Sequence, residues 1–372
     1  MTDDRARVNL LSFGDAKDPR KTDAVFAAAL SAGVPLFVPA GEYVLHGTLR
    51  LPAGTDLLAD GGATVKLADG AQRGRRDFLL TAENAENIRV CGGTWDGNAA
   101  GNDRGNDLFD PAATTGTLFN FRGVRGVTLA DLTLKNPLCY FLRFCEAEDV
   151  TVTDIAFSSD HAAINQDGVH LAGGCRRFTI RNLRGADGSP GDDFVALNAD
   201  DCVTRQENFD TVCADIENIT VENVISGGCH CFVRLLSVDH AIRGVTIRNV
   251  GGAFRNGAVN LDASRYCRTP LFRDADRPHG VGRIENILLE DFNVRGTAGA
   301  GSFIDLETNC RALTVRQFVA AGKPPLLVLR KTAAHTLTLR TDRERIDRRF
   351  AEGEELTVHG SRIDLLTFDE TD

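Results

Sequence analysis

The sequence predicts an all-β fold, a right-handed parallel β-helix with a capping helix at its N-terminal end. Short strand-like segments recur along the chain, and equivalent apolar positions at Val127, Val150 and Phe178 are 23 and 28 residues apart. Asparagine and glycine recur at the ends of these segments, where they suit tight corners. The segments lack regular leucines and helical stretches, which disfavours the runner-up fold, a leucine-rich-repeat horseshoe.

The repeated segments make up most of the chain. Each begins with a polar residue and continues with apolar, polar and apolar residues, and a second short strand usually follows. Alternation with period two turns one face of each strand inward, so stacked coils bury a continuous apolar interior. Such segments begin at Glu86, Arg125, Glu148, Arg177, Glu217, Arg243 and Glu285.

Residues 1–67 are predicted to form the N-terminal cap and the first strands. Thr22 and Asp23 make a suitable N-cap for an apolar helix over residues 24–30, which ends at Gly33. A helix of this kind covers the open end of a solenoid, whose first coil otherwise exposes its apolar interior.

The remaining residues are predicted to continue the same domain. Residues 68–332 form the coils and residues 333–372 form a C-terminal cap, so residues 1–372 are one β-helix domain. Trp95 is expected to fill a coil rather than to serve as a platform for a sugar. Three longer excursions, rich in Asp, Asn, Arg and Gly, are expected to be loops beside the functional face. These loops cover residues 98–117, 200–215 and 264–282.

Composition disfavours several partners. The formal net charge of −10 argues against a nucleic acid, because phosphate binding needs a basic surface. The N-terminus lacks the apolar core of a signal peptide and the chain lacks a run of membrane-spanning length, so we expect no membrane partner and a cytoplasmic location. Ten cysteines without a secretion signal are expected to be reduced thiols that act as small apolar residues.

Three acids and a histidine gather in one part of the repeat pattern. Asp167, Asp192 and Asp193 lie at the start of two strand-like segments, and His230 leads a later one. Stacking the segments places Asp167, Asp193 and His230 in one column, with Asp192 at the bend beside them. Clustered acids repel one another, so a chemical use explains them better than folding does. Hydrolysis of a glycosidic bond requires one carboxylic acid and one carboxylate.

At these residues the chain resembles glycoside hydrolase family 28, the polygalacturonase family. The family's Asn-Thr-Asp, Gly/Gln-Asp-Asp and Gly-His-Gly motifs correspond here to residues 165–167, 191–193 and 229–231. The resemblance extends over residues 8–306 and includes the segment 92–98. It implies a right-handed parallel β-helix and a hydrolase that cleaves a pectin-type or related oligosaccharide.

The resemblance also implies a role for each residue of the motifs. Asp192 is the general acid, and His230 supports that acid or the sugar. Asp167 and Asp193 hold and activate the attacking water, so the anomeric centre inverts without a covalent intermediate. A carboxyl separation of roughly 6.5–9.5 Å is expected for this mechanism. The partner is an oligosaccharide substrate, and no cofactor and no metal are expected.

The residues predicted to bind the substrate differ from the family pattern. The family holds a uronate carboxylate with an Arg-Ile-Lys motif, which this chain replaces with Asn-Leu-Asp at residues 260–262. Arg234, Arg255 or Arg265 is expected to supply a substitute cation, because arginine grips a carboxylate through two hydrogen bonds. Otherwise the substrate is neutral or differently charged. The residues predicted to contact the substrate are Asn165, His170, Arg234, Asn260, Asp262 and Arg265.

Two other functions stay open. A β-helical lyase cleaves uronates by β-elimination, with a calcium ion or a Lys, Arg or Tyr base beside the acids. A non-catalytic β-helix binds glycans and releases no product. His230 and Cys229 also suggest zinc ligands, but adjacent strand residues point to opposite faces and chelate poorly. The residues leave open the sugar, endo or exo action and the oligomeric state.

Overall fold

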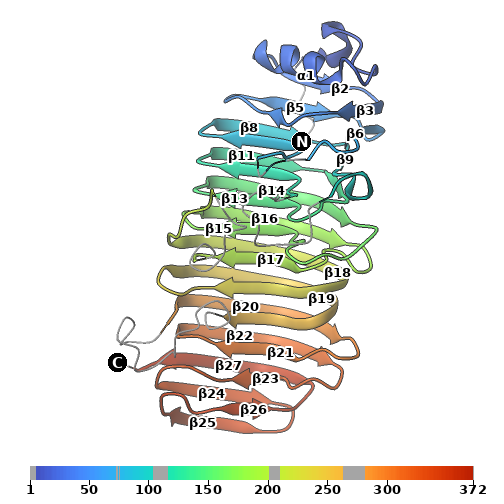
Figure 1. The fold of residues 1–372 in the computed structure, drawn as a ribbon. Helices are drawn as coiled ribbons and strands as arrows, with labels where there is room; N and C mark the ends of the chain where they lie inside the picture. The colour runs from blue at the N-terminus through green and yellow to red at the C-terminus, as the bar shows by residue number, and fades with distance from the viewer. Residues whose placement is uncertain are drawn as a thin grey trace.

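The chain folds into a right-handed parallel β-helix, as predicted, with helix α1 (Thr22–Ser31) over its N-terminal end (Figure 1). The structure, a computed structural model, describes residues 6–72, 74, 76–103, 116–200, 210–262 and 281–371. In this described part, 27 strands pair into one continuous sheet that winds around the core. The coils consist of strands rather than helices, so the leucine-rich-repeat alternative is wrong. None of the described helices is long and apolar enough to cross a membrane.

Each coil contributes strands to three parallel ladders, because residues on successive coils pair in register. The first ladder contains β4 (Leu49–Arg50), β7 (Leu80–Glu83), β10 (Phe119–Arg122), β13 (Leu142–Cys145), β15 (Val169–Ala172), β17 (Asp193–Asn198), the ends of β18 (Ile216–Leu236) and β19 (Ala241–Asp262), β21 (Ser302–Glu307) and β23 (Leu327–Leu329). The second ladder contains β1 (Val8–Asn9), β2 (Leu36–Val38), β5 (Asp56–Ala59), β8 (Glu86–Cys91), β11 (Arg125–Ala130) and the first parts of β14 (Glu148–Ser158), β16 (Arg176–Gly185), β18, β19, β20 (Arg283–Gly296) and β22 (Cys310–Ala321). The third ladder contains β3 (Gly41–Leu45), β6 (Ala63–Leu67), β9 (Thr94–Asp96), β12 (Thr133–Lys135) and the later parts of β14, β16, β18, β19, β20 and β22.

The C-terminal end is closed by strands that run in the opposite direction. β27 (Arg362–Glu370) pairs antiparallel with β22, and β26 (Leu356–Val358) pairs antiparallel with β23. β24 (His335–Thr341) and β25 (Arg345–Phe350) extend this antiparallel layer. These four strands form an antiparallel layer at the C-terminal end of the coils.

Helix α1 covers the first coil, but its first turn differs from the prediction. The helix begins at Thr22, so Lys21 is the N-cap residue, rather than Thr22 or Asp23. The hydroxyl of Thr22 is buried and donates to the carbonyl of Ala16 at 2.9 Å, so it does not cap the helix. Asp23 instead accepts a hydrogen bond from the backbone N–H of His46 at 3.1 Å.

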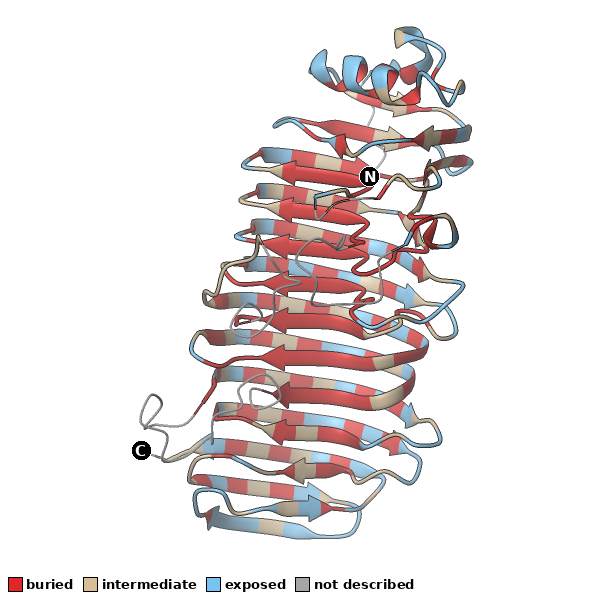
Figure 2. Ribbon diagram, viewed as in Figure 1, coloured by how far each residue is buried: buried red, intermediate tan, exposed pale blue. Residues whose placement is uncertain are grey.

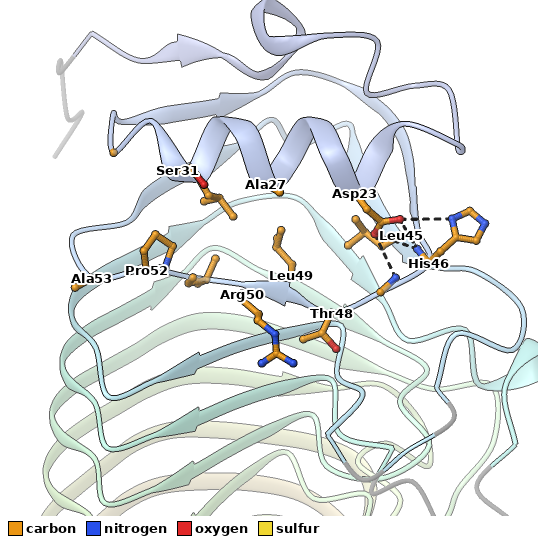
Figure 3. Close-up of a pocket in the computed structure, with 14 residues that line it drawn as sticks. Asp23, Ala27, Ser31, Leu45, His46, Thr48, Leu49, Arg50, Pro52 and Ala53 are labelled. Atoms are coloured by element: carbon orange, nitrogen blue, oxygen red, sulfur yellow. Dashed lines mark hydrogen bonds and ion pairs between the residues drawn. The ribbon is translucent and has the colours of Figure 1, made fainter.

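A pocket of about 880 Å³ lies between α1 and β4 (Figure 3). Its walls are mainly aliphatic and include Leu30 of the helix and Leu49 and Leu51 of the first coil. Asp23 and His46 lie together at one end of the pocket (Figure 3). Strands β7, β10 and β13 of the first ladder separate β4 from β15, so this pocket is remote from the predicted acids.

The interior is a continuous apolar core that contains stacked and edge-on aromatic rings. Phe157, Phe194 and Phe232 contact one another in order, with ring centroids 5.6 and 6.4 Å apart. Trp95 is fully buried and packs edge-on against Phe119, with ring centroids 5.2 Å apart. Trp95 therefore fills a coil, as predicted.

The middle of the first ladder is buried on both faces, unlike the second ladder. Strands β13, β15 and β17 are buried at every position, whereas β16 alternates between buried and exposed residues (Figure 2). Inward residues such as Leu171 join the apolar core, and several outward residues between them, such as His170, are polar but also buried. Buried polar side chains need specific partners, so this outward face is where a functional site is expected.

Most cysteines behave as predicted. Those that are free and buried lie in or beside strands, and burial raises the pKa of several of them, including Cys145 and Cys175. The free, buried cysteines among the described residues are Cys91, Cys139, Cys145, Cys175, Cys229, Cys231 and Cys310. Cys213 is disulfide-bonded, so the expectation of reduced thiols is wrong there. It lies in the partly exposed segment before β18 and is not packed into a strand.

Asparagines at one corner of the coils form a side-chain ladder. Asn182, Asn223 and Asn249 occupy equivalent positions of successive coils, with left-handed φ values of 56°, 60° and 57°. The Nδ2 of Asn223 donates to Oδ1 of Asn182 at 2.8 Å, and the Nδ2 of Asn249 donates to Oδ1 of Asn223 at 2.6 Å. Asparagine therefore has two roles at this corner: it tolerates the left-handed conformation, and its side chain forms a hydrogen bond with the next coil.

We expect Asn223→Ala to destabilise the protein more than Asn223→Gly does. Both variants lose the hydrogen bonds to Asn182 and Asn249, but alanine also strains the left-handed backbone, which costs about 1–2 kcal/mol. Urea unfolding of the two variants beside the wild type measures the difference. Equal midpoints for the two variants would show that the backbone conformation of this corner does not limit stability.

Candidate active site

One outward column of the first ladder carries many of the buried polar side chains. In chain order its members are Thr81, Asn120, Arg143, His170, Ala196, Arg234, Asn260 and Asp305. Asp167, Asp192 and Asp193 lie beside this column, where the chain bends into β15 and β17. Because the strands are parallel, these bends meet at one edge of the ladder.

Asp167 is held at the bend before β15 by two partners. Its Oδ2 lies 2.7 Å from Nδ1 of His170, and its Oδ1 accepts a hydrogen bond from the backbone N–H of Asp193 at 3.3 Å. Gly168 follows because a Cβ at that position would lie 2.6 Å from the carbonyl oxygen of Phe194. The contact with Asp193 joins two of the predicted catalytic residues across neighbouring coils.

Asp192 and His230 form a close ion pair. Oδ1 of Asp192 lies 3.1 Å from Nδ1 of His230, and Oδ1 of Asp193 lies 3.9 Å from the same nitrogen. The other oxygen of Asp192 accepts a hydrogen bond from the backbone N–H of Asn165 at 2.7 Å. The side chain of His230 is 37% exposed and that of Asp192 is 15% exposed, so solvent reaches this pair more than it reaches Asp193.

His230 pairs with a different residue from the one predicted. The predicted column of His230 with Asp193 is wrong by one residue, because Cys231 is the register partner of Asp193. On its other side, β18 pairs with β19 through a register irregularity between Cys229 and Cys231. The backbone N–H of His230 donates to the carbonyl of Asp192 at 3.1 Å, so the imidazole lies beside Asp192.

Arg234 joins two acids in a buried ion triad. Its Nη1 lies 3.4 Å from Oδ2 of Asp193, and its Nη2 lies 3.1 Å from Oδ2 of Asp262. No side chain of the triad is more than 7% exposed. The sequence predicts Arg234 and Asp262 as substrate contacts, whereas the structure gives each of them a partner within the protein. Arg234 therefore positions Asp193.

The acids differ in protonation because their partners differ. Burial raises the pKa of Asp167 to about 7, and the charge of Asp193 adds to this rise while His170 opposes it. Burial also acts to raise the pKa of Asp192, but the contact with His230 outweighs it, so the pKa of Asp192 is lowered. Contacts with Asp192 and then Asp193 raise the pKa of His230 to about 9. At neutral pH His230 is therefore protonated, Asp192 is ionised and Asp167 is partly protonated.

Asp192, Asp193 and His230 are also spaced to hold a cation. One ligand atom of each lies within 4.8 Å of the others. A metal-bound imidazole must be neutral, whereas the raised pKa keeps His230 protonated at neutral pH. Burial raises the pKa of the Cys229 and Cys231 thiols, which makes them poor zinc ligands. In this structure Asp192 and His230 form an ion pair.

Two of the predicted substrate contacts form the wall behind the acids. Asn165 adopts a left-handed φ of 61°, which directs its backbone N–H to Asp192. His170 is buried between Asp167 and Tyr140, whose ring centroid lies 4.4 Å from that of the imidazole. Both residues belong to the site, but their contacts here are with the protein itself.

The cations predicted to grip a sugar carboxylate have different surroundings. Arg234 is paired with two acids, and Nη2 of Arg255 donates to the carbonyl of Gly191 at 2.5 Å. Arg265 lies outside the described residues. Asn260 occupies the outward column next to Arg234, and its buried Oδ1 accepts no hydrogen bond from the described residues.

Two residues of the site were not predicted. The amide of Gln166 donates to the carbonyl of Pro137 at 3.0 Å and accepts from the backbone N–H of Gly191 at 3.1 Å, so it braces the segment that carries Asp192. Arg143 is a buried cation in the outward column, next to His170. The sequence signal for it was an arginine within the otherwise apolar strand β13.

We expect Arg234→Met to destabilise the protein by about 3–5 kcal/mol, because it leaves Asp193 and Asp262 buried with their shared cation removed. The double variant Arg234→Met/Asp262→Leu should recover part of that loss. Urea unfolding of both variants measures the effect. A single variant within about 1 kcal/mol of the wild type would contradict the triad's role.

Comparison with known proteins identifies the family. The profile of the glycosyl hydrolases family 28 matches residues 32–232, more than half of the chain. An exopolygalacturonase of Arabidopsis thaliana is 27% identical over 265 residues, which cover 65% of this chain and 54% of that protein. A polygalacturonase of Persea americana is 23% identical over 202 residues, which cover 50% and 42%. The chain thus spans about half the length of the relatives it matches.

Solved structures share the fold. A hyperthermoactive exopolygalacturonase from Thermotoga maritima aligns over 97% of this chain and 95% of its own, with a TM-score of 0.55 and 16% identity. The Streptococcus pneumoniae surface protein and adhesin PfbA aligns over 87% and 96%, with a TM-score of 0.56 and 12% identity. The fold is therefore common to enzymes and an adhesin, and the profile match decides between them: the chain belongs to the glycosyl hydrolases family 28.

Proposed function

We propose that the protein is a glycoside hydrolase that cleaves a pectin-type or related oligosaccharide by general acid/base catalysis. The observation that carries this proposal is the meeting of Asp167, Asp192 and Asp193 with His230 at one edge of the first ladder. Acids with different partners supply both a proton donor and a proton acceptor, as hydrolysis of a glycosidic bond requires. Because the relatives are named as polygalacturonases, oligosaccharides of galacturonic acid are the first substrates to test.

In this proposal Asp192 gives a proton to the leaving oxygen, while Asp167 and Asp193 take a proton from the attacking water. Asp192 is the most exposed of the three carboxylates and lies against protonated His230, so the pair can replace the proton that Asp192 gives away. Water attacks the anomeric carbon as the bond to the leaving oxygen breaks, and the product has the inverted configuration.

Inversion is proposed from the family's pattern of three acids and not from their spacing. An oxygen of Asp192 and an oxygen of Asp193 lie within 4.8 Å, closer than the roughly 6.5–9.5 Å typical of acid and base in inverting enzymes. The anomer of the first product is therefore the decisive measurement.

The test is a product screen against pectic, rhamnose-containing and neutral oligosaccharides, in which NMR identifies the anomer first released. A cleaved oligosaccharide with an inverted anomer supports the proposal. An unsaturated product that absorbs ultraviolet light would indicate a lyase. Saturable binding without any product would indicate a glycan-binding protein.

We expect Asp192→Asn to lower kcat by at least about 100-fold, because the amide cannot donate the proton that the leaving oxygen needs. The isosteric change should leave the unfolding midpoint near that of the wild type. Asp187→Asn, an exposed acid before the same bend, is the control and should keep full activity. Retained turnover in Asp192→Asn would rule out Asp192 as the acid.

We expect kcat/KM to depend on pH in a bell shape. Asp167 must lose its proton to act as a base, so kcat/KM should rise as the pH increases through about 7, its raised pKa. The pair of Asp192 and His230 must hold a proton to act as the acid, so kcat/KM should fall as the pH increases through about 9, the raised pKa of His230. Initial rates on one oligosaccharide across this range test both limbs. A fall through pH 7 would instead make Asp167 the acid.

A further inference from the structure

Arg143 is a buried guanidinium with too few partners. It lies in β13 and is only 2% exposed. Its Nε donates to Oδ1 of Asn120 at 2.8 Å, but its buried Nη1 has no hydrogen-bond partner. Within the described residues no aspartate or glutamate forms an ion pair with it, whereas the other buried arginine of the column, Arg234, has two.

A charge buried in this way needs compensation that the described residues do not supply. Arginine keeps its charge in proteins, and burying a charge without an opposite charge is costly. The rings of Phe78 and Tyr140 lie 5.7 and 5.9 Å from the guanidinium carbon, near the outer limit of a cation–π contact at about 6 Å. These rings and one amide oxygen leave the hydrogen-bonding capacity of Arg143 unfilled, so an anion is the missing partner.

Arg143 is next to the acids. It is the register partner of His170, whose imidazole contacts Asp167, so it lies one coil, about 4.7–4.9 Å, from the coil that carries Asp167. The ring of Tyr140 contacts both the guanidinium and the imidazole. A sugar bound over Asp167 and extending toward the N-terminal coils would therefore pass over Arg143.

Other cations near the acids have partners within the part of the chain that the structure describes. Arg234 is occupied by two acids, and the rung where the family has arginine and lysine carries Asn260 and Asp262. Asp262 itself is one of the acids that hold Arg234. Among the described residues, the guanidinium without an acidic partner, Arg143, thus lies on the N-terminal side of the acids.

We propose that Arg143 binds the carboxylate of a uronic acid residue next to the bond that is cleaved, on the side of the acids facing the N-terminal coils. This inference rests on the proposed function and extends it, because it makes the substrate an acidic oligosaccharide and names the residue that recognises the acid group. Asn120 and Tyr140 position Arg143, and the carboxylate supplies the missing hydrogen-bond acceptor.

The test compares an acidic oligosaccharide with its carboxyl-reduced, neutral counterpart. Binding is measured by calorimetry on Asp192→Asn, so that it does not depend on turnover. We expect the Asp192→Asn variant to bind a trisaccharide of uronic acid about ten- to a hundred-fold more tightly than the carboxyl-reduced, neutral trisaccharide. Adding Arg143→Gln to this variant should remove that preference. Affinity for the neutral trisaccharide should stay within about two-fold of its original value.

Two further variants make the result specific. Arg143→Lys keeps the charge and should keep part of the preference, even if Arg143→Gln proves unstable. Arg125→Gln removes an exposed arginine of the preceding coil and should change neither affinity. An equal loss of affinity for both oligosaccharides in Arg143→Gln, an unchanged preference, or no binding to Asp192→Asn would overturn the inference.

The outcomes separate this inference from the proposed function. If the wild type cleaves the uronate and Arg143→Gln keeps the preference for it, the function stands and the inference fails. If no substrate is cleaved but the uronate preference depends on Arg143, the inference stands and the hydrolase proposal fails.

Discussion

The stacking of parallel strands in register is the interaction on which the rest of the structure depends. Neighbouring strands lie about 4.7–4.9 Å apart, and each coil repeats the pairing of the coil before it. Residues far apart in the sequence therefore become neighbours at fixed distances. Asp167 and Asp193 are joined in this way, because the backbone of one coil donates to the side chain of another. The same constraint builds the asparagine ladder on the outside and aligns the phenylalanines inside.

A stacked array that buries its outward face must also neutralise the charges placed there. Asp193 faces an arginine, Asp192 faces His230, and Asp167 faces the imidazole of His170. Each acid is thus compensated by a different residue, and the imidazole beside Asp192 is far more exposed than the one beside Asp167. This difference, rather than proximity alone, moves the pKa values of Asp167 and Asp192 in opposite directions. A fold that held the acids equally close with identical partners would not provide both a donor and an acceptor.

Local patterns in the sequence predicted the coils because alternation and left-handed corners act within a few residues. They placed the acids in one neighbourhood, since strand starts in a parallel ladder share an edge. These local patterns gave wrong predictions where a contact between residues distant in the sequence decides which side chains meet. The register of β17 on β18 pairs Asp193 with Cys231 and leaves His230 beside Asp192, and the second acid that holds Arg234 lies one coil further on. The N-cap of α1 also differs from the prediction, because Thr22 and Asp23 form hydrogen bonds with residues outside the helix.

The family pattern and the electrostatics of the free protein differ in which carboxyl group they predict to be protonated. The pattern requires a proton on Asp192 and none on Asp167, whereas burial raises the pKa of Asp167 and His230 lowers that of Asp192. Binding of a sugar acts on these groups unequally. Asp167 is already buried, so a ligand changes its solvation little, but Asp192 and His230 are partly exposed and lose water when covered. Loss of water favours a neutral carboxyl and a neutral imidazole over an ion pair, which moves the proton from His230 to Asp192. Under the proposed function the acid therefore forms when the substrate binds, at the most exposed of the three carboxylates.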